Sequence, residues 1–440
     1  MTQKRIVIDG RNLALEAGTG VATYARNLSH SIHDLGHHVA VLYGGKGAPG
    51  TSALMKEIAF FDTHAGDAPK WLKLTRNIRA AATHLHWHRA TPIPLTGTVI
   101  AEHFRARLPY FDALYNSANL YSRASWLYGS FGPLHRVNFQ GPRPDLMHWT
   151  YPLPLQVPRT PNLYTIHDLV PLRLPYTTLD NKRRYFRLVR RLAQTADHIV
   201  TVSESSKADI ISILGVHHSR ITNTYQAVHI PRKYADKPLD VVQREIEGVF
   251  GLEFKEYFLF WGAIEPKKNI SRLIEGYLAS RVKAPLVIVG AQAWKSENEL
   301  RLLYEDNIRT LLQVGAETRV KRRIIQLSYV PYSLLVSLIR GAKATVFPSL
   351  YEGFGLPVLE SMLLGTPVMS SITSSIPEVA GDAALLVDPY DTRQISHAIR
   401  TLDADEEFRA SLAEKGIRQA QLFSQERYLD RLKGVYEMLL

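Results

Sequence analysis

Short apolar runs alternate with helical patterns along the first half of the chain. The strand-like runs are residues 5–10, 37–45, 145–149, 162–168 and 198–204. A helical pattern over residues 21–35 places Tyr24, Leu28 and Ile32 near one face, and Ser203 is expected to cap the helix after the last run. Apolar strands that alternate with helices predict a parallel sheet with helices on both faces.

A second series follows residues 228–240, a polar segment with two prolines that we interpret as a linker. Its strand-like runs are residues 257–264, 285–291, 323–330, 343–349, 366–371 and 383–389. Helices are predicted over residues 269–278, 297–312 and 332–340 and from Leu356 onward. The predicted fold class is therefore α/β, with two doubly wound domains in tandem and a ligand in the cleft between them.

Residues 60–143 show little of this alternation. The stretch from Phe104 to Phe139 holds nine aromatic residues and four arginines but a single acid, Asp112. Three interpretations stay open: aromatic side chains that pack a helical insert of the N-terminal domain, contact with a membrane or a lipid-linked acceptor, and binding of single-stranded nucleic acid. The motif HLHWH (residues 84–88) is either a partly exposed strand or loop, or a metal site of alternating histidines.

Charge and composition narrow the choice of compartment and partner. The net charge is +12, and residues 1–200 hold 24 Lys and Arg against 12 Asp and Glu, so the whole excess lies in the first half. A basic half attracts phosphates, anionic lipid or nucleic acid, or is simply a basic soluble surface. The absence of cysteine excludes disulfides and thiolate metal sites. No run approaches the roughly 20 apolar residues of a spanning helix, and the first residues read as a strand and not as a secretion signal.

The stretch FPSLYEGFGLPVLE (residues 347–360) combines a buried strand, a glycine-rich turn and the start of a helix. Pro357 suits the first turn of a helix. The amides of Phe354, Gly355 and Leu356 would face outward at the positive end of the helix dipole, where a phosphate binds well. Glu352 and Glu360 flank this turn, and a carboxylate can accept from two neighbouring sugar hydroxyls. The turn therefore predicts a site for a sugar nucleotide.

A second strand–turn–helix unit, WGAIEPKKNISRLIEGY (residues 261–277), places two lysines before a helix. Asn269 is expected to be the N-cap of that helix. Lys267 and Lys268 directly precede it, where a lysine can neutralise a phosphate, although a solvated lysine in a turn would look the same in sequence.

Several segments together resemble the retaining glycosyltransferases of family 4, which have the GT-B fold of two Rossmann-like domains facing each other across a cleft. These segments are EPKKN, FPSLYEGFGLPVLESMLLGTPV, SSIPEVAGDAALLVDPYD, YTIHDLVPLRLPY, TVSESSKADI and YVPYSLLVSLIRGAKATVFPS. They stand in the family's order and cover nearly all of residues 160–395 and the first 45 residues. The expected domains are an N-terminal acceptor domain over 1–235 with its insert near 60–143, a nucleotide-sugar domain over 250–420, and a helix over 421–440 that crosses back.

The resemblance implies a role for each motif residue. Glu352 would lie near the donor hexose, Glu360 would accept from the nucleoside ribose, and Lys268 would neutralise the diphosphate. His167 of the "HD" motif would lie at the reacting sugar, so the candidate catalytic residues are His167, Glu352 and Lys268. Further donor-binding positions are Lys267, Gly353, Phe354, Gly355, Leu356, Gly18 and Gly20.

Two departures from the family pattern are visible. Many members have an arginine at the position of Ala263, and in this chain Lys267 is the candidate for the second positive charge. Ala227 stands where the family often has a glycine, which puts the geometry of the hinge in question.

The implied reaction moves a hexose from a nucleotide diphosphate sugar to a glycan hydroxyl with retention, and mannose from GDP-mannose is favoured over UDP-glucose or dTDP-rhamnose. No metal and no other cofactor is expected. The acceptor would be a lipid-linked oligosaccharide of surface-polysaccharide or O-antigen assembly, so the protein would be cytoplasmic and peripheral on the anionic inner membrane face, without a nucleic-acid partner.

Other functions stay open beside this one. A nucleotide-sugar epimerase of the same fold would need no acceptor, whereas a phosphorylase would need a pyridoxal-phosphate lysine motif that the sequence lacks. A non-catalytic sugar-nucleotide-binding subunit is disfavoured by the intact Glu352, Glu360, Lys268 and His167. The neutral second half disfavours a nucleic-acid groove across both domains.

Overall fold

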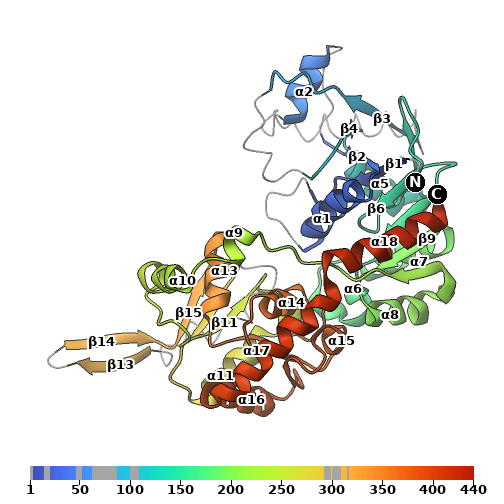
Figure 1. The fold of residues 1–440 in the computed structure, drawn as a ribbon. Helices are drawn as coiled ribbons and strands as arrows, with labels where there is room; N and C mark the ends of the chain where they lie inside the picture. Colours follow the sequence, from blue (N-terminus) through green and yellow to red (C-terminus); the bar gives the residue numbers. More distant parts are fainter. Residues whose placement is uncertain are drawn as a thin grey trace.

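The computed structural model describes residues 3–13, 20–45, 52–61, 87–99, 109–291, 299, 309–314 and 317–440. It contains two α/β domains, each built around its own largely parallel sheet, with the N-terminal domain above the C-terminal one in Figure 1. This arrangement confirms the predicted α/β class.

The N-terminal domain holds a ten-stranded sheet of order β10-β9-β8-β6-β1-β2-β4-β3-β5-β7, in which β3 runs antiparallel to β4. The strands are β1 (Arg5–Asp9), β2 (His38–Tyr43), β3 (Trp87–Ile93), β4 (Ala113–Asn116), β5 (His135–Phe139), β6 (Leu146–Trp149), β7 (Leu155–Gln156), β8 (Asn162–Thr165), β9 (His198–Thr201) and β10 (Ile221–Asn223). Because successive side chains of a strand point to opposite faces, Ile6 and Ile8 join one hydrophobic core and Val7 joins the other. Both faces of the sheet are therefore covered.

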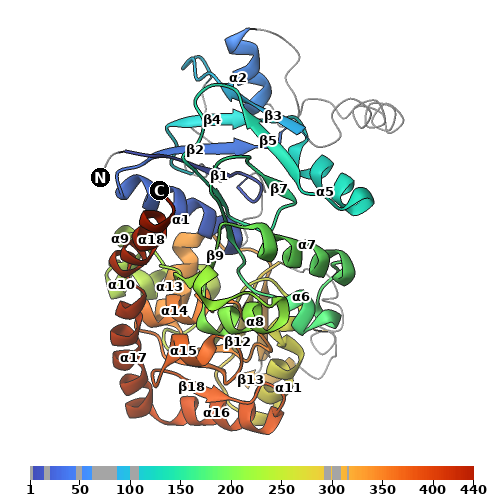
Figure 2. The same ribbon diagram turned by 90° about the vertical axis from the view of Figure 1, so that its right-hand side faces the viewer.

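Helices cover this sheet on both sides, as Figure 2 shows. They are α1 (Gly20–Asp34), α2 (Ala53–Phe61), α5 (Leu120–Phe131), α6 (Val170–Arg173), α7 (Lys182–Thr195) and α8 (Glu204–Leu214), with short 3₁₀ turns η1 (Pro175–Thr177) and η2 (His218–Arg220). The predicted cap of α8 is confirmed, because the Ser203 side chain accepts from the amide of Ser206.

The C-terminal domain holds a six-stranded parallel sheet of order β15-β12-β11-β16-β17-β18. Its strands are β11 (Phe258–Trp261), β12 (Leu286–Val289), β15 (Ile324–Leu327), β16 (Ala344–Phe347), β17 (Val368–Ser371) and β18 (Leu385–Val387). Its helices are α9 (Arg232–Ala235), α10 (Leu239–Glu245), the π-helical η3 (Ile246–Phe250), η4 (Pro266–Lys268), α11 (Ile270–Ser280), α13 (Tyr332–Gly341), α14 (Leu356–Leu363), α15 (Ile376–Ala380), α16 (Thr392–Ala404), α17 (Glu406–Ala420) and η7 (Gln421–Phe423).

A β-hairpin projects from this domain where part of a helix was predicted. Strands β13 (Arg309–Val314) and β14 (Glu317–Arg322) pair antiparallel and extend away from the sheet (Figure 1). The predicted helix over 297–312 is therefore wrong at its carboxyl end. The two runs are separated by two residues, which is the spacing of a hairpin and outweighs the helical propensity of the leucines.

The chain crosses between the domains twice. The first crossing, residues 224–231, leads from β10 to α9, which packs on α13. The second, residues 421–424, leads from α17 to α18 (Gln425–Leu439), which runs up to the N-terminal domain in both ribbon views. There Tyr436 hydrogen-bonds through its hydroxyl to His148 Nδ1 at 2.9 Å. The two crossings meet where the rings of Tyr225 and Phe423 contact each other, with centroids 5.2 Å apart.

The described part of the aromatic insert belongs to the N-terminal domain. Strands β4 and β5 join the main sheet, and Tyr115, Tyr121 and Tyr128 are buried in its core. The packing interpretation is therefore confirmed for these side chains, but the insert is not purely helical. His88 is buried in β3, whereas His84, His86 and the region from Phe104 to Leu108 lie outside the described residues.

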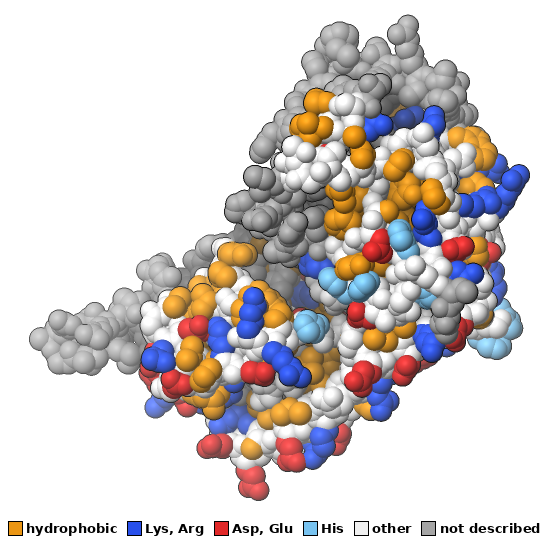
Figure 3. Space-filling view, turned by 45° about the horizontal axis from the view of Figure 1, so that its top comes forward, with side chains coloured by type: hydrophobic (Ala, Val, Ile, Leu, Met, Phe, Trp, Pro, Cys, Tyr) orange, Lys and Arg blue, Asp and Glu red, His pale blue; other side chains and the backbone are white. Residues whose placement is uncertain are grey.

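The described residues contain no cluster of metal ligands and no helix that could span a membrane. Within these ranges, no group of three His, Cys, Asp or Glu side chains lies close enough to hold a metal ion. None of the described helices is both long and apolar enough to cross a bilayer. On the face seen in Figure 3, acidic side chains gather mainly on the lower, C-terminal part of the molecule.

Candidate functional site

The turn between β16 and α14, residues 348–356, forms what we call the glycine corner. Gly355 has φ of 105°, in the left-handed region that favours glycine, and a Cβ atom there would lie 2.8 Å from Ile376 Cδ1. A Cβ atom at Gly353 would lie 2.8 Å from Asp168 Oδ2. Both glycines are therefore needed for close packing. Pro357 stands in the first turn of α14, as predicted.

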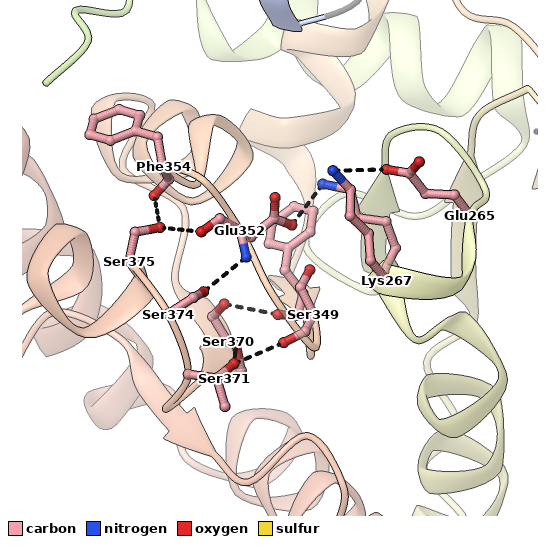
Figure 4. A network of polar contacts seen from close by, with 12 residues as sticks. Glu265, Lys267, Ser349, Glu352, Phe354, Ser370, Ser371, Ser374 and Ser375 are labelled. Atoms are coloured by element: carbon pink, nitrogen blue, oxygen red, sulfur yellow. Dashed lines mark hydrogen bonds and ion pairs between the residues drawn. The ribbon is translucent and has the colours of Figure 1, made fainter. Parts of the chain in front are cut away.

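Serine side chains fix the backbone of the glycine corner (Figure 4). The Ser374 hydroxyl accepts from the amide of Glu352 at 2.8 Å, and the Ser375 hydroxyl bonds to the carbonyls of Glu352 and Phe354, both at 2.9 Å. Among the described residues, no acceptor is found for the amides of Phe354 and Gly355. Together with the free first-turn amide of Leu356, they form a donor group at the positive end of α14.

The lysine loop, residues 265–269, lies against this corner. Its backbone is tied there because the carbonyl of Lys267 accepts from the amide of Leu350 at 2.8 Å. Asn269 stands at the N-cap position of α11, as predicted, but its side chain does not cap the helix. Asn269 adopts the left-handed conformation, and its Nδ2 donates instead to the carbonyls of Pro348 and Pro389. Its role is to join the two turns.

The two lysines of this loop meet carboxylates. Lys268 Nζ lies 2.7 Å from Glu352 Oε1, and both side chains are nearly buried. Lys267 Nζ lies 3.3 Å from Glu265 Oε1, as Figure 4 shows. Burial alone would lower the pKa of Lys267, but the carboxylates of Glu265, Asp168 and Glu352 outweigh it and raise that pKa. Burial likewise opposes ionisation of Glu352, yet Lys268 and Lys267 lower its pKa. This part of the site is therefore charged.

Glu360 lies one helical turn further along α14. Trp261 Nε1 donates to its Oε2 at 3.3 Å, and Tyr332 of α13 is close enough for the two groups to interact electrostatically. Burial raises the pKa of Glu360 to about 7, and among the described residues no cation offsets it. Near neutral pH this carboxyl can therefore accept or donate a hydrogen bond.

The N-terminal domain presents His167 at the carboxyl end of β8. Its Nε2 bonds to the carbonyl of Thr150 at 3.0 Å, and the Tyr24 ring lies edge-on with centroids 4.7 Å apart. A carbonyl can only accept, so Nε2 carries the hydrogen. Burial lowers the pKa of His167, which keeps the ring neutral with Nδ1 as its acceptor.

The two domains contact each other around this site. The Ser206 hydroxyl donates to the carbonyl of Gly353 at 3.3 Å, and a Cβ atom at Gly20 of α1 would lie 3.6 Å from Leu356 Cδ1. The Glu378 carboxylate accepts from the amides of Glu204 and Ser205 at 2.9 Å each, so it caps α8 from the other domain. The amino ends of α1 and α14 therefore face each other.

Most of the predicted site residues are thus brought together. One cluster holds Lys267, Lys268, Glu352, Gly353 and Gly355. Glu360 lies one turn further along α14. His167 belongs to the other domain, and its neighbour Asp168 lies against Gly353. The Phe354 ring lies apart, packed with centroid distances of 6.3 Å to Tyr225 and 5.6 Å to Phe423, so only its backbone faces the site. Gly18 lies outside the described residues.

Sequence reasoning missed several groups that shape the site. Trp261 holds Glu360, and Ser374 and Ser375 hold the glycine corner. Serines directly after a strand and before a short helix are a visible turn signal. Asp9 is buried beside Thr150. It lies in the first strand, and no sequence pattern there indicates a functional role.

The site as a whole combines two kinds of groups. Lysines and free amides stand on the C-terminal side, and a neutral histidine and buried carboxyl groups stand around them. Such a site can hold an anionic diphosphate at one end and hydroxyl-bearing rings at the other.

Comparison with known proteins agrees with this chemistry. Residues 98–230 match the model of glycosyltransferase family 4, and residues 242–419 match that of the group 1 glycosyl transferases. O-antigen chain mannosyltransferase B of Escherichia coli is 34% identical over 284 residues, which are 62% of this chain and 70% of that protein. The serotype-specific mannosyltransferase WbdA of the same species is 28% identical over 265 residues, 59% of this chain but only 31% of that longer protein.

The fold has close counterparts among solved structures. Anabaena HepE in complex with UDP and glucose superimposes with a TM-score of 0.63 at 14% identity, covering 99% of this chain and 100% of that one. The chain has two Rossmann-like domains, matches both family models and has a relative that is 34% identical. It therefore belongs to the GT-B glycosyltransferases, with a family 4 domain followed by a group 1 domain.

Proposed function

We propose that this glycosyltransferase moves a mannosyl residue from GDP-mannose to a hydroxyl of a growing surface polysaccharide, with retention of the anomeric configuration. The observation that carries the proposal is the contact of Lys268 with Glu352 at 2.7 Å, directly beside the free amides of the glycine corner. The choice of mannose and of an O-antigen-like product is supported by the names of the two similar Escherichia coli proteins.

The diphosphate of the donor would take the place of Glu352 as the partner of Lys268. As the bond between the anomeric carbon and the diphosphate breaks, negative charge grows on the leaving oxygen. Lys268, Lys267 and the amides at the start of α14 are positioned to stabilise that charge, and preorganised donors of this kind are usually the largest catalytic contribution. These groups supply positive charge without a metal, so we propose a metal-independent reaction.

The sugar rings of the donor would meet the carboxyl groups and the histidine. Glu352, released from Lys268, would accept from hexose hydroxyls, and Glu360 would bind the ribose. His167, with Nδ1 as its acceptor, would take a hydroxyl of the reacting sugar. The acceptor hydroxyl would attack on the face that the diphosphate leaves, with its proton passing to the departing phosphate oxygen, which accounts for retention without a nucleophilic side chain.

A lipid-linked acceptor would bring the protein to the cytoplasmic face of a membrane. This part of the proposal is supported by the basic N-terminal half, which holds the whole excess of positive charge. Such a domain is attracted to a negatively charged lipid surface.

A donor screen tests the proposal. Thermal unfolding is followed with GDP-mannose, UDP-glucose, dTDP-rhamnose and the free nucleotides, on the wild type and on Glu360→Ala. GDP-mannose is expected to raise the melting temperature most, and the variant to lose that rise. Stabilisation by a UDP or dTDP sugar alone would overturn the choice of donor. Mass spectrometry of the donor incubated alone then separates transfer from epimerisation, since an epimerase alters the sugar nucleotide without any acceptor.

A further inference from the structure

Helix α7 carries an unusual concentration of positive charge. Its sequence, KRRYFRLVRRLAQT, has six basic residues among fourteen and no acid. The exposed members are Arg183, Arg187, Arg190 and Arg191. Their spacing of i, i+4, i+7 and i+8 places them on one face, while Val189, Leu192 and Ala193 on the opposite face are buried in the core.

This arginine face costs the isolated protein stability. Like charges four residues apart on a helix repel each other. In the described part of the chain, no carboxylate forms an ion pair with any of the four arginines. A repelling face without internal partners is explained if an external anion covers it.

Exposed apolar side chains lie on segments next to α7. Leu179 and Tyr176, just before α7, are 69% and 57% exposed, and Trp126 is 51% exposed on α5. The two helices are in contact, because the Arg184 guanidinium donates to the carbonyl of Ser125. Tyr176 also lines a cavity of about 360 Å³ together with Tyr390 of the other domain. The surface therefore adjoins an opening between the domains.

We propose that the arginine face, with Leu179 and Trp126, docks on the surface of an anionic bilayer. Arginines would meet lipid phosphates while the apolar side chains enter the interface, and the aliphatic Leu179, which offers no ring for a base to stack on, favours a bilayer over a nucleic acid. The inference rests on the proposed lipid-linked acceptor, which would reach the site from that surface.

Co-sedimentation with vesicles tests the docking surface without any sugar nucleotide. Vesicles of phosphatidylethanolamine and phosphatidylglycerol are compared with pure phosphatidylcholine. The variant R183Q/R187Q/R190Q/R191Q is expected to lose at least about tenfold in binding to the anionic vesicles. The control R244Q/K283Q/R393Q/R418Q removes the same charge from the C-terminal domain and should bind like the wild type.

The outcomes separate the surface from the activity. An equal loss of vesicle binding in both variants would mean that only net charge matters, which would overturn the proposal. Unchanged vesicle binding by the α7 variant would overturn it too. So would binding of single-stranded RNA in place of vesicles. Stabilisation by GDP-mannose should be the same in all three proteins. If no nucleotide sugar stabilises any of them, the proposed function fails while the vesicle result still stands.

A second inference concerns how His167 is held, and rests on a separate set of contacts. Asp9 at the carboxyl end of β1 is fully buried. One of its carboxyl oxygens accepts from the amide of Thr150, and the other accepts from the amide of Arg11 at 3.3 Å. The carbonyl of the same Thr150 receives the Nε2 hydrogen of His167.

These contacts give Asp9 a specific task. Asp9 anchors the amide of Thr150 and so restricts how this residue can shift, and the direction of the Thr150 carbonyl decides which ring nitrogen of His167 keeps the hydrogen. The nearby Tyr121 offers a contrast. Its hydroxyl accepts from Gly10 at 3.1 Å and donates to the carbonyl of Leu42, so it holds the same strand end without reaching Thr150.

We infer that Asp9 is a positioning residue for His167, acting through the backbone of Thr150 to hold the imidazole with its hydrogen on Nε2. Nδ1 is then presented as an acceptor to the sugar. Nitrogen-15 NMR of histidine-labelled protein reads this directly, with His167→Gln used to assign the signal. The wild type should show a neutral ring protonated on Nε2, and protonation on Nδ1 in the wild type would by itself overturn the inference.

Substitutions then separate positioning from folding. Asp9→Asn should mix the two tautomers and lower kcat at least about tenfold, whereas Tyr121→Phe should change neither by more than about twofold. In a His167→Gln background, Asp9→Asn should cost no further activity, because a group that acts through His167 has nothing left to act on. A full additional loss in that background would mean a purely structural role. The NMR result needs no donor, so it stands even if the proposed reaction does not.

Discussion

Ionisable groups have opposite pKa shifts on the two sides of the site. Around the lysine loop, oppositely charged neighbours outweigh the effect of burial. The pKa of Lys267 is raised and that of Glu352 is lowered, so both stay charged. On the N-terminal side, burial prevails: the pKa of His167 is lowered and that of Asp9 is raised to about 6, so both move toward neutrality. The difference suits a ligand that is anionic at one end and carries only hydroxyls at the other.

The largest effect is expected from removing the charge at Lys268. Lys268→Ala should lower kcat by roughly 100- to 1000-fold, the usual loss when one preorganised group at a developing charge is deleted. Steady-state kinetics with the donor identified in the screen measures this. Lys415→Ala, which breaks the exposed pair with Asp382, is the matched control and should behave like the wild type. A near-normal kcat for Lys268→Ala would show that the charged side is not where the leaving group lies.

Glu360 tests whether the sugar-binding part of the donor site extends along α14. Glu360→Ala should raise the donor KM by roughly 10- to 100-fold, as expected for a lost hydrogen bond to a carboxyl group, with a smaller change in kcat. The same kinetic assay at saturating acceptor measures it. An unchanged donor KM would remove the ribose assignment.

Glu360 is an exception to the contrast between a charged C-terminal side and a neutral N-terminal side. It is a carboxyl group of the C-terminal domain, and burial keeps it partly neutral. Its pKa rises from 4.5 to about 7 on folding, so the unfolded state ionises first as pH rises. Its contribution to the free energy of unfolding should therefore fall between about pH 4.5 and 7 and stay level above that.

Urea unfolding over that pH range measures the effect. Glu360→Gln should gain roughly 1–3 kcal/mol relative to the wild type between those limits. Glu414→Gln, at an exposed carboxyl on α17, should follow the wild-type curve. A pH-independent difference between Glu360→Gln and the wild type would mean that Glu360 is ionised throughout.

The smallest effect concerns the backbone that presents the amides. Gly355→Ala places a Cβ atom against Ile376 at a positive φ and should cost about 1–3 kcal/mol of stability while raising the donor KM. Gly248→Ala, in open space with an ordinary φ, should be neutral or slightly stabilising. Equal stability of the two variants would show that the glycine corner tolerates a side chain.

Much of the fold could be predicted because its strands are continuous apolar runs, such as Phe258–Trp261, that alternate with helical patterns, which is typical of a doubly covered parallel sheet. The hairpin at 309–322 was missed because its leucines favour a helix locally and only the pairing of the two runs decides otherwise. The closeness of Glu352 to the two lysines could be predicted, because their turns follow strands of one parallel sheet. The role of Asn269 could not, since its partners Pro348 and Pro389 lie 79 and 120 residues away.

The two crossings between the domains limit how the molecule can move. Because Tyr225 on one crossing contacts Phe423 on the other, we expect the two domains to pivot at this point. Phe354 of the glycine corner packs against both rings. A closing rotation would then displace atoms in proportion to their distance from that point. The amide end of the donor site would stay almost still, and the outer rim at Tyr176 and Tyr390 would open widest, so donor and acceptor would experience very different amplitudes of the same motion.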